Sequence, residues 1–251
     1  MLSNIHFVGG EKGGIGKSVF ARLLAQYHID HQLPFCVFDS DRSHGAMLRF
    51  YGDYSAPVAL DAFDSADLIV ETALEQPQDV IVDLAAQTAT PLFQWIDDND
   101  LVSLAADEGI GLVFWHLMDD GADSISLLRG MLQRRDGREQ LVVVRNRGRG
   151  GNFGRFDDSP ERADAEQAGA VLMDLPVLHE ATMRKVDHQA VSFWAAANNR
   201  DAMGLMDRQR VKVWLRKAYL PLDQIAQTLF VVPAAADAAA SDPALALEPS
   251  L

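Results

Sequence analysis

The stretch that decides the fold is NIHFVGGEKGGIGKS, residues 4–18. It starts as a short β-rich run, passes into glycine, and is followed by a helical pattern over residues 17–32. A glycine-rich turn between a strand and a helix is suited to bind phosphate, because its backbone N–H groups and the helix N-terminus both attract anions. The stretch therefore predicts a phosphate-binding loop at the start of an α/β domain.

The loop departs in one position from the usual phosphate-loop pattern G-x-x-x-x-G-K-[ST], because Glu11 stands where the first glycine belongs. The chemistry is retained: Lys17 can reach the β and γ phosphates, and the Ser18 hydroxyl can hold Mg²⁺. A plain turn would leave Lys12 and Lys17 as a poorly compensated positive pair, which argues for a bound anion. The residues expected to bind the nucleotide in this loop are Gly10, Glu11, Lys12, Gly13, Gly14, Ile15, Gly16, Lys17, Ser18 and Val19.

The sequence KGGIGKS, residues 12–18, resembles the deviant Walker A signature KGGxGK[ST] of the ParA/MinD family of ATPases. The resemblance implies an ATP-dependent homodimer in which Lys12 reaches the nucleotide held by the partner subunit, so that Lys12 and Lys17 are both catalytic. A group that acts across an interface in this way can contribute about 10³ to 10⁵ in rate. The simpler alternative is that Lys12 only adds positive potential to its own site.

Two aspartates follow the second predicted strand. The segment VFDSDRSHG, residues 37–45, resembles the D-x-D switch segment of the family. The resemblance places Asp39 in the Mg²⁺ shell and gives Asp41 the catalytic role of orienting the attacking water. Arg42 and Ser43 stand where the common partition proteins have Pro and Gln, which leaves the details of switching, and a close assignment to chromosome partition, open.

A third carboxylate ends DVIVD, residues 79–83, which resembles a Walker B strand with Asp83 as a Mg²⁺ ligand, and the residues after it resemble a second switch segment. Adenine is favoured over guanine, because the guanine-reading N-K-x-D motif is absent from the end of the fifth predicted strand. By resemblance Asn146 contacts the base and Pro176 lines its pocket. The cofactors implied are ATP and Mg²⁺.

Apolar runs alternate with helical patterns along the chain, which predicts strands buried on both faces and joined by helical crossovers. The fold class expected is α/β: a single domain with a mainly parallel, doubly wound sheet and helices on both faces, of the P-loop NTPase type. Strands are predicted at 4–10, 34–39, 79–85, 110–118, 140–146 and 169–176, with a minor strand at 58–63. Helices are predicted at 17–32, 65–76, 121–135, 160–168, 188–198 and 207–220.

Composition sets the remaining expectations. Residues 1–230 should form the ATPase domain, and the Ala/Pro-rich acidic residues 231–251 a flexible tail. The net charge of −14, the single cysteine Cys36 and the lack of a long apolar stretch favour a cytoplasmic protein without membrane insertion. The seven histidines form no metal-ligand spacing in the sequence.

The branch of the family is less defined than the loop. Several segments, WHLMDDGADS among them, resemble TraL/StbB-type ATPases of plasmid conjugation and stability, which implies switched association with DNA or a partner protein. The alternatives are a localisation or secretion adaptor with little hydrolysis, and a metabolic ligase on the same fold. Two basic clusters could contact DNA phosphates or simply be solvated: Arg145, Arg147, Arg149, Arg208, Lys212 and Arg216.

Overall fold

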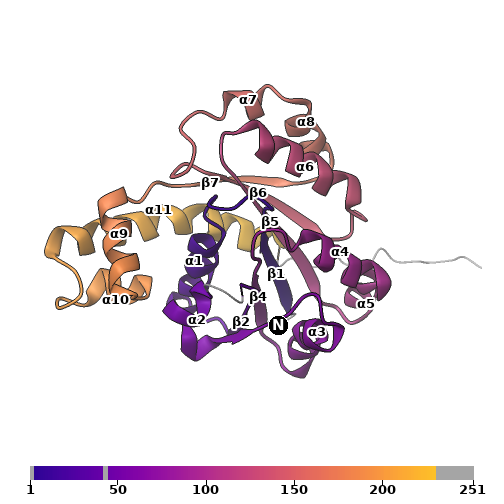
Figure 1. The fold of residues 1–251 in the computed structure, drawn as a ribbon, viewed down its shortest axis with the longest axis horizontal. Coiled ribbons are helices and arrows are strands. Elements are labelled where there is room, and N and C mark those ends of the chain that lie inside the picture. The colour runs from indigo at the N-terminus through magenta and orange to yellow at the C-terminus, as the bar shows by residue number, and fades with distance from the viewer. Residues whose placement is uncertain (1–2, 42–44, 230–251) are drawn as a thin grey trace, which may run out of the picture.

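The computed structural model describes residues 3–41 and 45–229, and within them one seven-stranded sheet runs through the molecule (Figure 1). Every pairing in it is parallel, and the strand order is β3-β2-β4-β1-β5-β6-β7. The strands are β1 (Asn4–Gly9), β2 (Phe35–Asp39), β3 (Ser55–Pro57), β4 (Asp79–Asp83), β5 (Gly111–Met118), β6 (Gln140–Asn146) and β7 (Val171–Leu175).

Helices cover both faces of this sheet (Figure 1). One hydrophobic core joins the sheet to α1, α10 and α11, and a second joins its other face to α3, α4, α5, α6 and α8. The helices are α1 (Lys17–Asp30), α2 (Ala46–Phe50), α3 (Phe63–Glu75), α4 (Ala89–Asp98), α5 (Leu101–Asp107), α6 (Ala122–Arg134), α7 (Gly154–Asp157), α8 (Pro160–Gln167), α9 (Glu180–Gln189), α10 (Phe193–Asn198) and α11 (Leu205–Leu229), with a 3-10 turn at Gly52–Tyr54.

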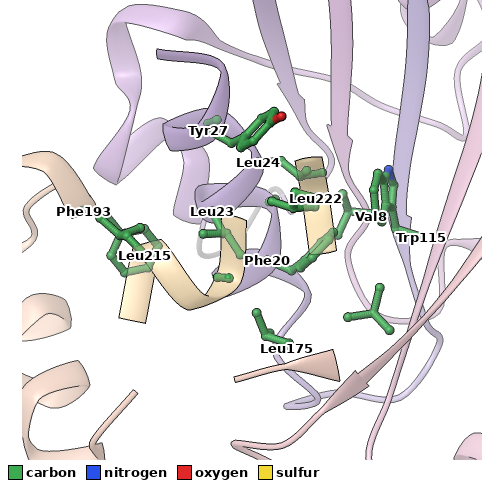
Figure 2. Packing of buried hydrophobic residues seen from close by; sticks show 14 of the residues in the cluster. Val8, Phe20, Leu23, Leu24, Tyr27, Trp115, Leu175, Phe193, Leu215 and Leu222 are labelled. Carbon is green, nitrogen blue, oxygen red and sulfur yellow. The ribbon is translucent and has the colours of Figure 1, made fainter. Parts of the chain in front are cut away.

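The first core fixes α1 against the sheet, and with it the loop that precedes α1. Figure 2 shows Phe20 and Leu24 of α1 gathered with Val8 and Trp115 of the sheet and with Leu222 of α11. The rings of Phe20 and Trp115 lie 5.1 Å apart, centroid to centroid. Burial of large side chains on both sides of α1 holds the helix N-terminus at the carboxyl end of β1, where ligands of parallel sheets bind.

The predicted fold class is confirmed, and the main strands lie where the apolar runs predicted them. The minor strand expected at 58–63 is wrong: the short strand is Ser55–Pro57, and the residues after it turn into α3. The alternating apolar residues Val58 and Leu60 resemble a strand pattern, and both are buried, at 3% exposure, but they lie in a loop.

The single helix expected over residues 188–198 is also wrong, because two helices meet there. Ala190 adopts a left-handed conformation with φ 49°, which ends α9. Ser192 then caps α10, its hydroxyl accepting a hydrogen bond from the Ala195 N–H at 3.2 Å.

The remaining expectations on composition are tested in part. Cys36 lies half-buried on β2, and burial raises the pKa of its thiol to about 11. None of the helices described is long and apolar enough to cross a membrane. The expected tail at 231–251 lies outside the described residues.

Candidate nucleotide-binding site

The glycine-rich loop leaves β1 and turns into α1 through backbone conformations that need glycine. Gly14 and Gly16 have φ values of 77° and 97°, in the left-handed region. Gly16 is constrained a second time, because a Cβ atom there would lie 2.4 Å from the Asn146 amide nitrogen. A Cβ atom on Gly13 or Gly14 would meet nothing within 4 Å, so the loop is open on the side where a phosphate would lie.

Lys17, the first residue of α1, points back into the loop. Its Nζ donates to the Lys12 carbonyl oxygen at 3.0 Å, and the side chain is only 7% exposed. Burial lowers the pKa of Lys17, and the charges of Asp83 and Asp41 oppose that shift. The ammonium group therefore already lies among carboxylates, and a phosphate would add a second source of negative charge.

Asp83 and Asp39 end adjacent strands and are paired in the register of β4 and β2. Asp83 is 2% exposed, and a hydrogen bond joins it to the Ser18 hydroxyl. Its Oδ1 atom is buried without a hydrogen-bond partner among the described residues. Burial, reinforced by the charge of Asp39, raises the pKa of Asp83 to about 7.

These donors fit Mg²⁺. A buried carboxylate oxygen that meets no partner among residues 3–41 and 45–229, beside a serine hydroxyl, belongs to the hard oxygen donor set that this ion takes in phosphate sites. Asp39 fits less directly, because its two oxygens already accept backbone hydrogen bonds, from the Asp41 N–H at 3.0 Å and the Met47 N–H at 2.8 Å. Burial raises the pKa of Asp39, and these hydrogen bonds oppose the shift.

Asp41 is half-buried at the end of the same segment, and Lys17 and Asp83 both lie within the range of its charge. The three carboxylates predicted from two separate segments thus meet at one edge of the sheet. Arg42 and Ser43, on which the departure from the family pattern rests, lie outside the described residues.

Lys12 contacts an aspartate that the sequence did not single out. Its Nζ donates to Asp119 Oδ2 at 2.7 Å, and this hydrogen bond raises the pKa of Lys12. Asp119 follows β5 and is fixed by the Ser124 hydroxyl at 2.6 Å and the Gly121 N–H at 3.0 Å. Partial burial raises the pKa of Asp119, but hydrogen bonds led by the one from Lys12 lower it overall. The sequence could have indicated this contact, because Asp119 directly follows a predicted strand and therefore lies at the same sheet edge as the loop.

Ser40 is a second residue that the sequence pattern missed. Its hydroxyl donates to the Asp83 carbonyl at 3.0 Å and accepts from the Ala85 N–H at 2.8 Å. The hydroxyl therefore joins the segment after β2 to the segment after β4. A serine between two aspartates of a strand-end motif could have suggested such a link.

The two residues predicted to border the base lie at the same sheet edge. The Asn146 side chain donates to the Ile15 carbonyl at 2.7 Å and accepts from the Gly148 N–H at 3.0 Å. It therefore joins the phosphate loop to the segment that follows β6. The Pro176 carbonyl accepts from the Trp214 indole N–H at 2.8 Å. Contact of either residue with a base stays a prediction.

The two predicted basic clusters differ in how far their charges are compensated. Arg145 pairs with Asp157 and Asp174, both at 2.8 Å, and Arg147 pairs with Asp174 at 3.0 Å. Lys212 and Arg216 are exposed on α11. Arg149 is likewise exposed, and Arg208 is half-buried.

The structure also gathers two histidines that the sequence left apart. Nitrogens of His6 and His28 and a carboxylate oxygen of Asp79 lie within 4.8 Å of one another, at the amino end of β4. A metal does not fit here: the Trp115 indole N–H donates to His6 Nδ1 at 3.1 Å, so in the neutral ring Nε2 carries the proton and has no lone pair to offer. The cluster is a buried hydrogen-bond network.

His28 is the second histidine of this network. Its Nδ1 faces the Leu24 carbonyl at 2.8 Å and its Nε2 faces Asp79 Oδ2 at 3.0 Å, so both nitrogens meet acceptors. Burial raises the pKa of Asp79, but the hydrogen bond with His28 at 3.0 Å and the His6 ring, whose Nε2 lies 3.6 Å away, outweigh it and hold that pKa well below its usual range.

Comparison with known proteins agrees with this geometry. The fold is shared with the MinD cell division protein of Aquifex aeolicus, at a TM-score of 0.51 and 13% identity, over 86% of this chain and 95% of that one. The molecule therefore has the ParA/MinD-like P-loop α/β fold. In sequence it is TraL-like: it is 26% identical to a Protein TraL of Escherichia coli over 90% of this chain and 99% of that protein, and 30% identical to another over 53% and 57%. No family model matches the chain.

Proposed function

We propose that this chain is a cytoplasmic, Mg²⁺-dependent ATPase that closes into a homodimer around two ATP molecules and switches its association with DNA or a partner protein. The process we propose is plasmid partition, stability or conjugal transfer, by analogy with the TraL relatives. The observation that carries the proposal is the loop with two lysines, of which Lys17 lies buried beside Asp83 while Lys12 is held outside that group by Asp119.

The chemistry follows from the positions of the side chains. The loop N–H groups and Lys17 bind the phosphates, and Ser18 and Asp83 hold Mg²⁺, which neutralises phosphate charge when bound. Asp41 orients the attacking water from the end of the neighbouring strand. Lys12 leaves Asp119 on dimerisation and completes the site of the other subunit.

Replacing Lys12 by alanine is expected to leave ATP binding by the monomer nearly intact but to abolish the ATP-dependent dimer. The rate of hydrolysis should fall by about 10³-fold, which is the lower end of the range for a group that acts across an interface. Dimerisation is measured by gel filtration with ATP and with ADP, and hydrolysis by phosphate release. Lys217→Ala removes the same charge from an exposed position on α11 and should change neither.

Unchanged dimerisation and hydrolysis in the Lys12→Ala protein would show that the lysine serves only its own site. A wild-type dimer that binds ATP without measurable turnover, with partners present, would instead favour the adaptor alternative. Phosphate release that depends on a small metabolite and ignores DNA and proteins would favour the ligase.

We propose that any DNA contact is made mainly by α11, because Lys212 and Arg216 are exposed whereas Arg145 and Arg147 are paired. The Lys212→Gln/Arg216→Gln protein should bind duplex DNA more weakly in the presence of ATP. Its plot of log K against log salt should be shallower by about 2, since about 0.9 counterions are released per phosphate contact. Fluorescence anisotropy measures this slope. The salt range is about 50 to 200 mM NaCl, over which electrostatic DNA binding weakens steeply.

The matched control is Arg138→Gln/Arg184→Gln, which removes two exposed charges elsewhere and should retain the wild-type slope. Wild-type binding that is indifferent to both salt and nucleotide would contradict a DNA switch.

A further inference from the structure

A cavity of about 290 Å³ lies beside the phosphate loop, on the face of the sheet that α4 and α6 cover. Gly9, Gly10 and Glu11 of the loop form one end of it, so one carboxylate side chain belongs to the lining. The volume is close to the lower end of the range for small-molecule pockets, about 300 Å³. Its walls are largely apolar and include Phe7, Leu92, Phe93, Phe114, Leu127 and Met131.

One buried polar atom in this apolar lining has no partner. His116 is 6% exposed, and its Nε2 atom makes no hydrogen bond among the described residues. A hydrogen bond to the Ser124 backbone favours the charged ring, so the Ser124 group is an acceptor and Nε2 is left with the lone pair. Burial lowers the pKa of His116 to about 4, so the ring is neutral near pH 7. A buried acceptor of this kind is costly unless something donates to it.

The cavity persists because side chains are missing at two places on its wall. Gly9 is the register partner of His116 on the neighbouring strand and contributes no side chain beside the ring. Gly130 lies inside α6, where glycine is less favourable than alanine. A Cβ atom on Gly130 would meet nothing within 4 Å, so packing does not demand glycine there, and a larger side chain would enter the cavity.

The polar side chain of Arg134 also lines the cavity. Arg134 lies in the last turn of α6, is exposed, and has its guanidinium 5.2 Å from the Phe93 ring centroid. No carboxylate pairs with it in the part of the chain that the structure describes. An anionic group on a ligand would find a cation there.

We propose that this cavity binds a small amphipathic carboxylic acid: an aromatic or branched apolar body between α4 and α6, one N–H or O–H group donating to His116 Nε2, and a carboxylate near Arg134. The cavity shares Gly10 and Glu11 with the loop residues expected to bind the nucleotide, and α4 follows the strand that ends in Asp83, so its occupant would sense the nucleotide site. Binding itself does not depend on the proposed ATPase activity.

Indole-3-propionate is the probe, because it combines an aromatic body, one N–H donor and a carboxylate. Titration calorimetry on the nucleotide-free full chain should show saturable binding, and the N-methyl analogue, which lacks the donor, should bind about tenfold more weakly. Gly130→Leu should abolish binding by filling the cavity, whereas the matched Gly130→Ala should retain it within about twofold. Arg134→Gln should weaken both probes by about tenfold.

His116→Phe should make the two probes bind equally, since it removes the acceptor that distinguishes them. If that variant fails to fold, the Gly130 pair still decides the matter, because both substitutions lie on the open side of α6. Equal binding by the Gly130→Leu and wild-type proteins, no preference for the N–H probe in the wild type, or no binding of indole-3-propionate at all would each overturn the proposal.

Discussion

The Asp83→Asn protein is expected to lose Mg²⁺-dependent ATP hydrolysis while its nucleotide-free form becomes more stable than the wild type. Loss of the metal ligand should lower kcat by at least about 10²-fold, which is the lower end of the range for removing one preorganised electrostatic group. The gain in stability comes from the same carboxylate, which is buried beside Asp39 and has one oxygen without a hydrogen-bond partner in the described part of the chain.

The sign of the stability effect follows from the pKa. Burial raises the pKa of Asp83 from 3.8 to about 7, so the folded state disfavours its ionised form. Its stabilising contribution is present below about pH 4 and is lost as the pH rises through 7. Removing the charge should raise the free energy of unfolding at pH 8 by on the order of 2–4 kcal/mol, and by much less at pH 5.

Urea unfolding in EDTA at pH 5 and pH 8 measures this difference, and phosphate release measures the loss of activity. Asp53→Asn removes a carboxylate from an exposed position and should leave both quantities unchanged. A destabilised Asp83→Asn protein at pH 8 would mean that the carboxylate is already compensated within the chain.

Replacing Asp79 by asparagine is expected to destabilise the fold by about 3–5 kcal/mol, the usual effect of removing one partner of a buried ion pair. Asp79 accepts from the Asn4 backbone N–H at 3.0 Å and the Asn4 side-chain amide at 2.9 Å through Oδ1, and its Oδ2 faces His28 at 3.0 Å. Asparagine offers only one of these two acceptor oxygens, so the buried network cannot be kept intact. Because the pKa of Asp79 is lowered in the folded state, the wild-type contribution is present above about pH 4 and is lost as the pH falls below it. Thermal and urea unfolding at pH 7 and pH 3.5 measure the effect.

The control for Asp79 is Asp98→Asn, an exposed aspartate at the end of α4 that should change stability little. Asp79 and Asp83 lie at opposite ends of β4, so the Asp79→Asn protein that remains folded should bind ATP like the wild type. Wild-type stability in this variant would show that the network is not an ion pair.

Local chemistry made the loop, the strands and the carboxylates at the strand ends predictable. Each of these features depends on a few neighbouring residues. Gly16, before Lys17, can adopt the φ of 97° that the loop needs, and the apolar run that ends in Asp83 predicts a buried strand. Parallel strands then bring Asp39 and Asp83 to one edge, because both residues end their strands and the carboxyl ends of parallel strands lie at the same end of the sheet.

The contacts that sequence reasoning missed join distant segments. Lys12 and Asp119 are 107 positions apart, and no periodicity connects them. The error at 58–63 has a different cause: buried Val58 and Leu60 alternate as strand residues do, although tertiary contacts alone bury them. The break at Ala190 was hidden because alanine normally favours helix, and only the cap at Ser192 shows that a new one begins.

The Ser40 hydroxyl has a consequence for timing. Because it bonds to the Asp83 carbonyl and to the Ala85 N–H, neither the segment after β2 nor the segment after β4 can move alone without breaking a buried hydrogen bond. The two segments should therefore change conformation in one concerted step, and under the function proposed above a partner would detect one switch and not two.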